Sequence, residues 1–196
     1  MSARRSPGQR AGLDSAQVLA AARLLLDEGG LDDLTMRALA GRMGVSPNAL
    51  YSHVESKTAL VDGVLDAVLA EVVAPDATGD PAAGLHAVMA STYEVLLAHP
   101  GLVPVYVARQ GARGPNAQRL GDVMLGLLER AGLHAHDARE GLRVLIVFTI
   151  GFAAFATGSP LEERAGRSPR ADELRRSFDR ALRWLLDGIV GARRSP

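Results

Sequence analysis

The chain has 196 residues, of which 47% are hydrophobic, enough for one substantial core or two small ones. Lys and Arg number 22, as do Asp and Glu, so the formal net charge is zero. That balance argues against a wholly basic nucleic-acid coat protein but leaves room for a local basic surface. The absence of cysteine excludes disulfides, thiolate metal sites and cysteine nucleophiles.

The N-terminal residues and the longest apolar run predict neither export nor membrane insertion. The start, MSARRSPGQRAG, has no apolar stretch behind it, so it does not resemble a secretory signal. Residues 1–12 predict a flexible basic arm, which either is simply disordered or touches DNA through Arg4, Arg5 and Arg10. The apolar run 144–157 has 14 residues, fewer than the roughly 18–20 that span a bilayer, and predicts a buried helix in a cytoplasmic protein.

Helix signals begin after this arm. Asp14 can cap a first helix, whose apolar residues recur at helical spacing until Gly29 and Gly30 permit a left-handed end. Thr35 can cap a second helix, and Gly44 can end it. No segment alternates convincingly as a strand, so the chain predicts an all-α fold.

The second and third helices have the spacing of a helix-turn-helix. Ser46 can cap the third helix, and Pro47 suits its first position because a proline lacks the N–H that would be unpaired there. The outward residues at this end are small or polar, as a helix entering a major groove requires. Asn48 can read a base edge through its amide, and Pro47 or Ala49 can pack on a thymine methyl group.

Three possible phosphate donors lie in the last part of the third helix and just beyond it. Tyr51, His53 and Lys57 carry a hydroxyl, an imidazole and an ammonium group. Lys57 is the only lysine of the chain and lies just after Ser56, which can open a fourth helix. Its charge then opposes the helix dipole, which a docked DNA phosphate would explain; an ordinary solvated lysine is the alternative.

The run LTMRALAGRMGVSPNALYSHVESKTALVDGVL, residues 34–65, resembles the DNA-binding domain of the TetR family of bacterial transcriptional regulators. The shared features are a Thr opening the second helix, Gly-Val at the turn, Leu-Tyr-x-His in the third helix and a Lys opening the fourth. The similarity covers residues 13 to about 72. Ser52 departs from the bulky aromatic residue that the family often has between Tyr and His, which leaves the operator sequence open.

The resemblance implies an all-α homodimer that binds a palindromic double-stranded DNA operator and is released by a small-molecule effector. It places the protein in the cytoplasm, associated with the nucleoid. By position it implies base contacts from Arg37, Pro47, Asn48 and Ala49, although Arg37 could be an ordinary surface arginine. It implies phosphate contacts from Thr35, Ser46, Tyr51, His53 and Lys57.

The residues from 74 to 81 break the helical pattern and predict a domain boundary. Beyond it, helices are predicted at 82–98, 102–111, 115–131, 136–158 and 171–191. We therefore expect a basic arm at 1–12, a three-helix helix-turn-helix domain at 13–73 with the fourth helix as a link, and a helical effector-binding and dimerisation domain at 81–192.

The last two long helices are apolar enough to predict an intermolecular four-helix bundle; the alternative is that they form only a monomer core. Aromatic residues with polar tips and flexible methionines predict a pocket for a largely apolar effector. The candidate lining residues are His86, Met89, Tyr93, Tyr106, Gln110, Met124, Phe148 and Phe152. We expect no cofactor and no metal, since His134 and His136 have no third ligand.

Taken together, the sequence predicts a ligand-responsive repressor. The alternative is a TetR-like architectural or nucleoid-binding protein without an effector, in which the pocket would be collapsed core. An enzyme is not expected, because the sequence has no glycine-rich phosphate loop, no nucleophile elbow and no metal-ligand spacing.

Overall fold

The computed structural model describes residues 14–75, 79–158 and 171–191, and these contain helices but no β-strand. The all-α fold predicted from the sequence is therefore confirmed for this part of the chain. The predicted basic arm, residues 1–12, lies outside the described residues. The chain divides into two compact units, residues 1–64 and 65–196, and the division falls inside a helix rather than in the break at 74–81.

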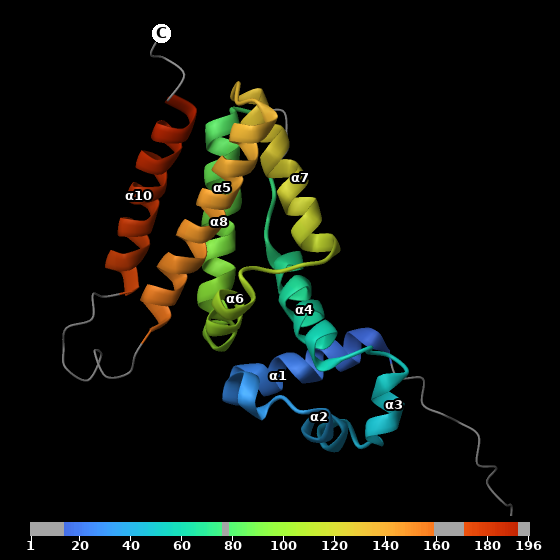
Figure 1. The fold of residues 1–196 in the computed structure, drawn as a ribbon. Coiled ribbons are helices and arrows are strands. Elements are labelled where there is room, and N and C mark those ends of the chain that lie inside the picture. The colour runs from blue at the N-terminus through green and yellow to red at the C-terminus, as the bar shows by residue number, and fades with distance from the viewer. Residues whose placement is uncertain (1–13, 76–78, 159–170, 192–196) are drawn as a thin grey trace, which may run out of the picture. The chain divides into compact units, whose positions relative to one another are not determined.

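The N-terminal unit consists of three helices and the first part of a fourth (Figure 1). They are α1 (Ser15–Asp33), α2 (Met36–Met43), α3 (Pro47–Tyr51) and α4 (Lys57–Val68). Four buried residues, Val18, Leu26, Leu39 and Leu50, bring α1, α2 and α3 into one small core. Each such side chain contributes about 1.5–3 kcal/mol on burial.

The helix ends of this unit follow the sequence signals. Asp14 accepts a hydrogen bond from the N–H of Ala16, and Thr35 and Ser46 cap α2 and α3 in the same way. Gly30 has φ 69° and breaks the regular helix of α1, while Gly44 has φ 66° and ends α2. Both glycines have a positive φ, which other residues rarely adopt, and Gly44 has the left-handed helical conformation that was predicted.

The C-terminal unit is a helical bundle. After α4, the short 3-10 helix η1 (Leu69–Glu71) leads to α5 (Pro81–Ala98), η2 (Pro100–Leu102), α6 (Val103–Arg109), α7 (Pro115–Arg130), α8 (Ala135–Thr157) and α10 (Ala171–Gly191). The helices α5, α7 and α8 pack on one another, α6 packs on α8, and α10 lies along α5 and α8 (Figure 1). Each helix falls within one or two residues of its predicted range.

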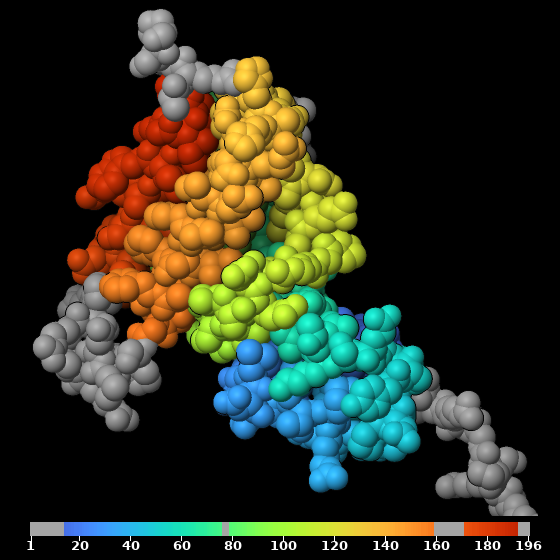
Figure 2. Space-filling view, viewed as in Figure 1, coloured from blue at the N-terminus to red at the C-terminus, as the bar shows by residue number. Residues whose placement is uncertain are grey.

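Helix α8 occupies much of the face of the C-terminal unit seen in Figure 2. Its buried residues, Ala138, Gly141, Leu145, Thr149 and Ala153, recur every three or four positions and form one narrow stripe. The helix has 23 residues, so by length and composition alone it could cross a membrane. The apolar run seen in the sequence has only 14 residues, whereas the whole helix is long enough to span a bilayer. Length therefore does not identify what covers the exposed apolar face of α8.

Candidate DNA-binding surface and effector cavity

One side of α3 packs in the core of the N-terminal unit, and its N-terminal end is exposed to solvent. Leu50 is fully buried and anchors the helix in the core of the N-terminal unit. Pro47 and Asn48 are exposed, and Ala49 is half-buried. A short helix with a buried anchor and an exposed polar N-terminal end is the arrangement that a recognition helix needs to reach base edges.

The two capping hydroxyls keep a free donor. The Oγ1 atom of Thr35 accepts from the N–H of Ala38 at 3.0 Å, and the Oγ atom of Ser46 accepts from the N–H of Ala49 at 3.3 Å. A hydroxyl oxygen that accepts in this way still carries an O–H that can donate. Both residues are exposed, so both hydroxyls can donate to a phosphate while they cap their helices.

Four further predicted contact residues are exposed and unpaired. Within the described part of the chain, the side chains of Arg37, Asn48, Tyr51 and His53 make no hydrogen bond or ion pair. Tyr51 is 54% exposed, which is a large exposure for an aromatic residue. These donors are therefore available to a partner outside the chain.

Arg42, unlike Arg37, is paired with an acidic residue within the N-terminal unit. Its guanidinium donates to both carboxylate oxygens of Glu28, at 2.6 and 2.7 Å, and so ties α2 to α1. The paired hydrogen bonds lower the pKa of Glu28 and raise the pKa of Arg42. Arg37, five residues earlier on α2, has no such partner among the residues that the structure describes.

Lys57 has an internal partner that the sequence did not reveal. Its ammonium group donates to the backbone oxygen of Leu31 at 2.8 Å. Leu31 follows the break at Gly30, so the lysine satisfies a carbonyl at the end of α1 and ties it to the start of α4. An ammonium group has three N–H donors, so this exposed residue retains two for a phosphate.

A cavity of about 210 Å³ lies within the C-terminal unit, among α5, α6, α7 and α8. Its walls are mainly apolar, with Leu96, Leu120, Met124 and Ile150 among them. None of its lining residues is charged. Such a site favours a ligand that is largely apolar.

Two threonines supply polarity to this cavity. Thr149 is fully buried, and its hydroxyl lies 3.3 Å from the sulfur of Met89, a weak acceptor. Thr92 donates to the backbone oxygen of Val88. A ligand carbonyl would be a better acceptor for Thr149 than the thioether is, so this hydroxyl is a candidate orienting group.

The eight residues predicted to line a pocket fall into two groups. Four of them line the cavity: Met89, Tyr106, Gln110 and Met124. The other four, His86, Tyr93, Phe148 and Phe152, do not line it, and their roles as effector contacts remain predictions. They lie in the seam where α10 meets α5 and α8.

Phe178 of α10 is the centre of the aromatic part of this seam. Its ring stacks on Tyr93 with centroids 3.9 Å apart, and it also contacts Phe148 and Phe152 at 5.4 and 5.5 Å. Burial raises the pKa of Tyr93. These rings hold α10 on the bundle, which is a packing role.

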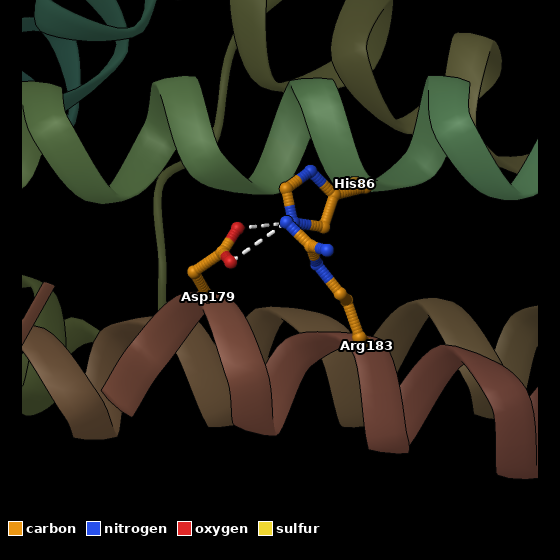
Figure 3. Close-up of polar contacts among 3 residues, drawn as sticks. All are labelled: His86, Asp179 and Arg183. Atoms are coloured by element: carbon orange, nitrogen blue, oxygen red, sulfur yellow. Dashed lines mark hydrogen bonds and ion pairs between the residues drawn. The ribbon is translucent and has the colours of Figure 1, made fainter. Parts of the chain in front are cut away.

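His86 lies at the same seam and makes a polar contact across it. Its Nε2 atom is 2.8 Å from Oδ1 of Asp179, whose other oxygen accepts from Arg183 at 2.8 Å (Figure 3). Asp179 and Arg183 are both on α10, one turn apart. The histidine therefore points toward α10 rather than into the cavity.

A hydrogen bond from α6 joins the wall of the cavity to the last part of α4. Tyr106, which lines the cavity, donates its hydroxyl to the backbone oxygen of Leu65. Burial raises the pKa of Tyr106, so the phenol stays protonated and remains a donor. The carbonyl of Leu65 lies in the last turn of α4, where carbonyls have few partners within the helix, so Tyr106 caps that end.

Asp66 caps α7 from another helix. Its carboxylate accepts from the backbone N–H groups of Asn116 and Ala117 at 3.2 and 2.8 Å, and from the side-chain amide of Asn116 at 3.1 Å. Gly114, at φ 147°, makes room, because a Cβ atom there would lie 2.5 Å from the carboxyl carbon. Sequence reasoning missed this residue, because Asp66 is one of two acids among the apolar residues of α4 and the sequence alone does not distinguish it from Asp62.

Comparisons with known proteins agree with both parts of the chain. Residues 18–64 match the model for bacterial regulatory proteins of the tetR family, and residues 75–183 match the tetracyclin repressor-like C-terminal domain. The class A tetracycline repressor protein of transposon 1721 from Escherichia coli is 37% identical over 161 residues, which is 77% of this chain and 67% of that protein.

Solved structures extend the similarity to the whole fold. ActR of Streptomyces coelicolor, in complex with actinorhodin, superposes with a TM-score of 0.83 at 26% identity, over 94% of this chain and 99% of that one. BioQ in complex with its double-stranded DNA operator superposes with a TM-score of 0.72 at 26% identity, over 91% and 98%. These proteins are similar in architecture to the chain described here.

Proposed function

The chain belongs to the TetR family of bacterial transcriptional regulators, and on that premise we propose a homodimeric repressor that a largely apolar small molecule releases from a palindromic operator. As a family member it is a ligand-responsive DNA-binding regulator. The observation that carries the proposal is the pairing of an exposed, unpaired recognition end on α3 with a mainly apolar cavity in the other unit. Its relatives' names describe regulators, and we propose no catalytic role.

At the operator, α3 would enter the major groove with Pro47, Asn48 and Ala49 toward the bases, and Arg37 would approach from α2. Thr35, Ser46, Tyr51, His53 and Lys57 would bind phosphates on either side. The free hydroxyls of the two caps and the unpaired side chains of Tyr51 and His53 support this division. The protein would act in the cytoplasm, on the nucleoid.

Replacing Lys57 with alanine is expected to weaken binding to all DNA sequences alike. One lost phosphate contact should lower the slope of log affinity against log salt concentration by about one unit. Fluorescence anisotropy over a salt series measures this slope, and Asn48→Ala is the contrasting variant because it should change sequence preference instead. A Lys57→Ala protein with altered preference and an unchanged slope would show that the two roles are assigned wrongly.

The effector would occupy the cavity among α5, α6, α7 and α8. Its apolar body would contact the leucine, isoleucine and methionine walls, and Thr149 would donate to a ligand oxygen. ActR binds actinorhodin, and by analogy we propose an organic ligand for this chain. The analogy does not extend to the identity of the compound.

Gly121→Leu is expected to block the effector without harming the fold. Gly121 lines the cavity, and a Cβ atom at this position would have no atom within 4 Å, so a leucine side chain has room to extend into the space. The variant should still bind operator DNA but no longer be released from it by the effector. Replacing a helical glycine should also raise the free energy of unfolding by about 0.5–1 kcal/mol.

Gly126→Leu is the matched control for this variant, since Gly126 is also on α7 with open space around its Cβ position and does not line the cavity. It should keep its response. Repression assays in cells, together with anisotropy on operator DNA, compare the two. A Gly121→Leu protein that is released normally would place the effector elsewhere.

Coupling between the cavity and DNA would pass through α4. This helix begins at Lys57 in the N-terminal unit, and its last part is bound by Tyr106 and by the start of α7. An effector that favours a different position of α6 or α7 would change those contacts. It can shift the equilibrium only by the difference in its affinity for the two states.

The direct test of the function is footprinting of the purified protein on fragmented genomic DNA from its source. We expect a few strong palindromic sites. Compounds that relate to the adjacent genes are then tested for release of the protein from those sites. Scattered, weak and salt-sensitive binding without a palindrome would contradict the proposal and favour an architectural protein.

A further inference from the structure

A second hollow of about 720 Å³ lies beside the cavity, between α6 and α8. The two helices pack against each other in the C-terminal unit, where both contribute to the face seen in Figure 2. Both hollows share five lining residues, Tyr106, Gln110, Leu142, Ile146 and Ile150. A ligand whose apolar body fills the cavity therefore has the outer hollow, which we call the α6–α8 groove, directly next to it.

The groove differs from the cavity in its charge. Arg139 and Arg143 line the groove, and neither hollow has an acidic lining residue. Arg143 donates to both oxygens of Glu140, at 2.8 and 2.9 Å. Arg139 is exposed and has no hydrogen bond or ion pair with any residue that the structure describes. The groove therefore presents one uncompensated guanidinium group.

The charge lies at one end of the groove. The lining residues on α8 run from Arg139 to Gly151, a length of roughly 18 Å at 1.5 Å per residue. The two arginines are in the first third of this length, and beyond them the α8 wall consists of Ile146, Val147, Ile150 and Gly151. The groove is thus apolar along most of its length and cationic at its start.

From this arrangement we infer that the effector is an amphipathic anion, with an acidic group bound at Arg139 and an apolar body that runs along α8 toward the cavity. The inference rests on the proposed function and defines the chemical class of its ligand. A guanidinium group binds a carboxylate or sulfonate through two parallel hydrogen bonds. A neutral ligand would partly desolvate Arg139 without pairing it, and a cation would be repelled.

Two fluorescent probes with one scaffold test the inference. 1-Anilinonaphthalene-8-sulfonate carries a negative charge, and N-phenyl-1-naphthylamine has the same rings without it. Wild-type protein should bind the sulfonate more tightly than the neutral amine. Arg139→Gln should weaken sulfonate binding about tenfold and leave binding of the amine unchanged. Arg139→Glu should weaken sulfonate binding further, since it reverses the charge.

Arg119→Gln is the matched control, because Arg119 is an exposed arginine on α7 that lines neither hollow and has no recorded partner in the described chain. It should bind both probes as the wild type does. Equal loss of both probes in Arg139→Gln, no loss of either, or no sulfonate binding to the wild type would each overturn the inference. Sulfonate binding that appears only in a monomeric variant would assign the groove to a second copy of the chain and would also overturn it.

The probe measurements contain no DNA, so they separate this inference from the proposed function. A protein that selects palindromic sites but shows no dependence on Arg139 remains a regulator with a ligand of another class. A protein that discriminates between the probes but selects no operator has an anion site without the proposed regulatory role.

Discussion

Phe155→Asp is expected to convert the dimer into a monomer and to lower operator affinity at least about a hundredfold. Phe155 is 63% exposed in the single chain, and Val144 is exposed on the same side of α8. Trp184 of α10 is 67% exposed. Large apolar side chains this exposed on the two helices predicted to form the bundle are explained by a second copy that covers them.

The expected magnitude follows from symmetry and from solvation. A dimer contacts two half-sites at once, whereas a monomer has only one recognition helix and loses most of the affinity and the specificity. Aspartate removes the apolar contact of an aromatic side chain and would also place an unpaired carboxylate in the interface, which is strongly unfavourable. One substitution per chain acts twice in a symmetric interface.

Sedimentation velocity at micromolar concentration measures the change in mass, and anisotropy on operator DNA measures the affinity. Trp184 is the only tryptophan of the chain, so its emission reports directly on burial at this surface. Val73→Asp is the control, since Val73 is 72% exposed and lies outside α8 and α10. A Phe155→Asp protein that remains dimeric would exclude this face from the interface.

The same interface explains the apolar character of α8. A helix with one stripe buried within its own unit and an opposite apolar face needs a second cover, which a bilayer or a partner helix could provide. Membership of a DNA-binding family favours the partner helix. The length of the apolar run alone could not decide this, because the helix begins about two and a half turns before that run, at Ala135.

Local features of the fold were predictable from the sequence. The caps at Asp14, Thr35 and Ser46, and the glycines with positive φ at positions 30 and 44, depend on neighbours within a few residues. Local signals of this kind fix helix ends well. They also fixed the helix-turn-helix, since its geometry follows from two helices and one tight turn.

The cavity was only partly predictable, because it depends on which face of each helix meets which neighbour. On α5, Met89 and Thr92 face the cavity, while His86 and Tyr93 face α10. These two faces are less than a third of a turn apart. Each face carries residues that could line a cavity, so residue type could not show which face does. The packing of α10 against His86 and Tyr93 leaves Met89 and Thr92 for the cavity.

Contacts between distant residues could not be predicted at all. Lys57 was interpreted through its place on α4, yet its partner is the carbonyl of Leu31, 26 residues away. The hydrogen bonds of Asp66 to Asn116 and Ala117 span 50 and 51 residues. Such pairs follow from tertiary packing, and a single sequence carries no periodic signal for them.

Asp66→Ala is expected to lower the free energy of unfolding by about 2–3 kcal/mol. Asp66 is 6% exposed, and its carboxylate accepts three hydrogen bonds at the start of α7. The cap residue of α7 is Gly114, which offers no side chain, so Asp66 is the side chain that satisfies these N–H groups. Alanine would leave them buried and unpaired, and would remove a negative charge from the positive end of the helix dipole.

Urea unfolding measures this loss, with all variants at the same protomer concentration because dimerisation contributes to stability. Asp66→Asn keeps one acceptor oxygen and should lose about half as much. Asp122→Ala is the control, since Asp122 is an exposed acid on α7 without a recorded partner among the described residues, and it should change stability by less than about 0.5 kcal/mol. A stable Asp66→Ala protein would mean that water replaces the carboxylate at this end.

The same variant tests the route from effector to DNA. Asp66 lies one residue after Leu65, whose carbonyl binds Tyr106, so α6 and α7 both hold the last turns of α4. Without the carboxylate, the hydrogen bonds that join α7 to α4 are lost, so a displacement of α7 by the effector would no longer displace α4. We therefore expect Asp66→Ala to bind effector and operator separately but to show a smaller coupling free energy between them. If the coupling free energy is unchanged in a measurably destabilised protein, Asp66 has only a structural role, and the contact of Tyr106 with Leu65 would transmit the effect of the effector to α4.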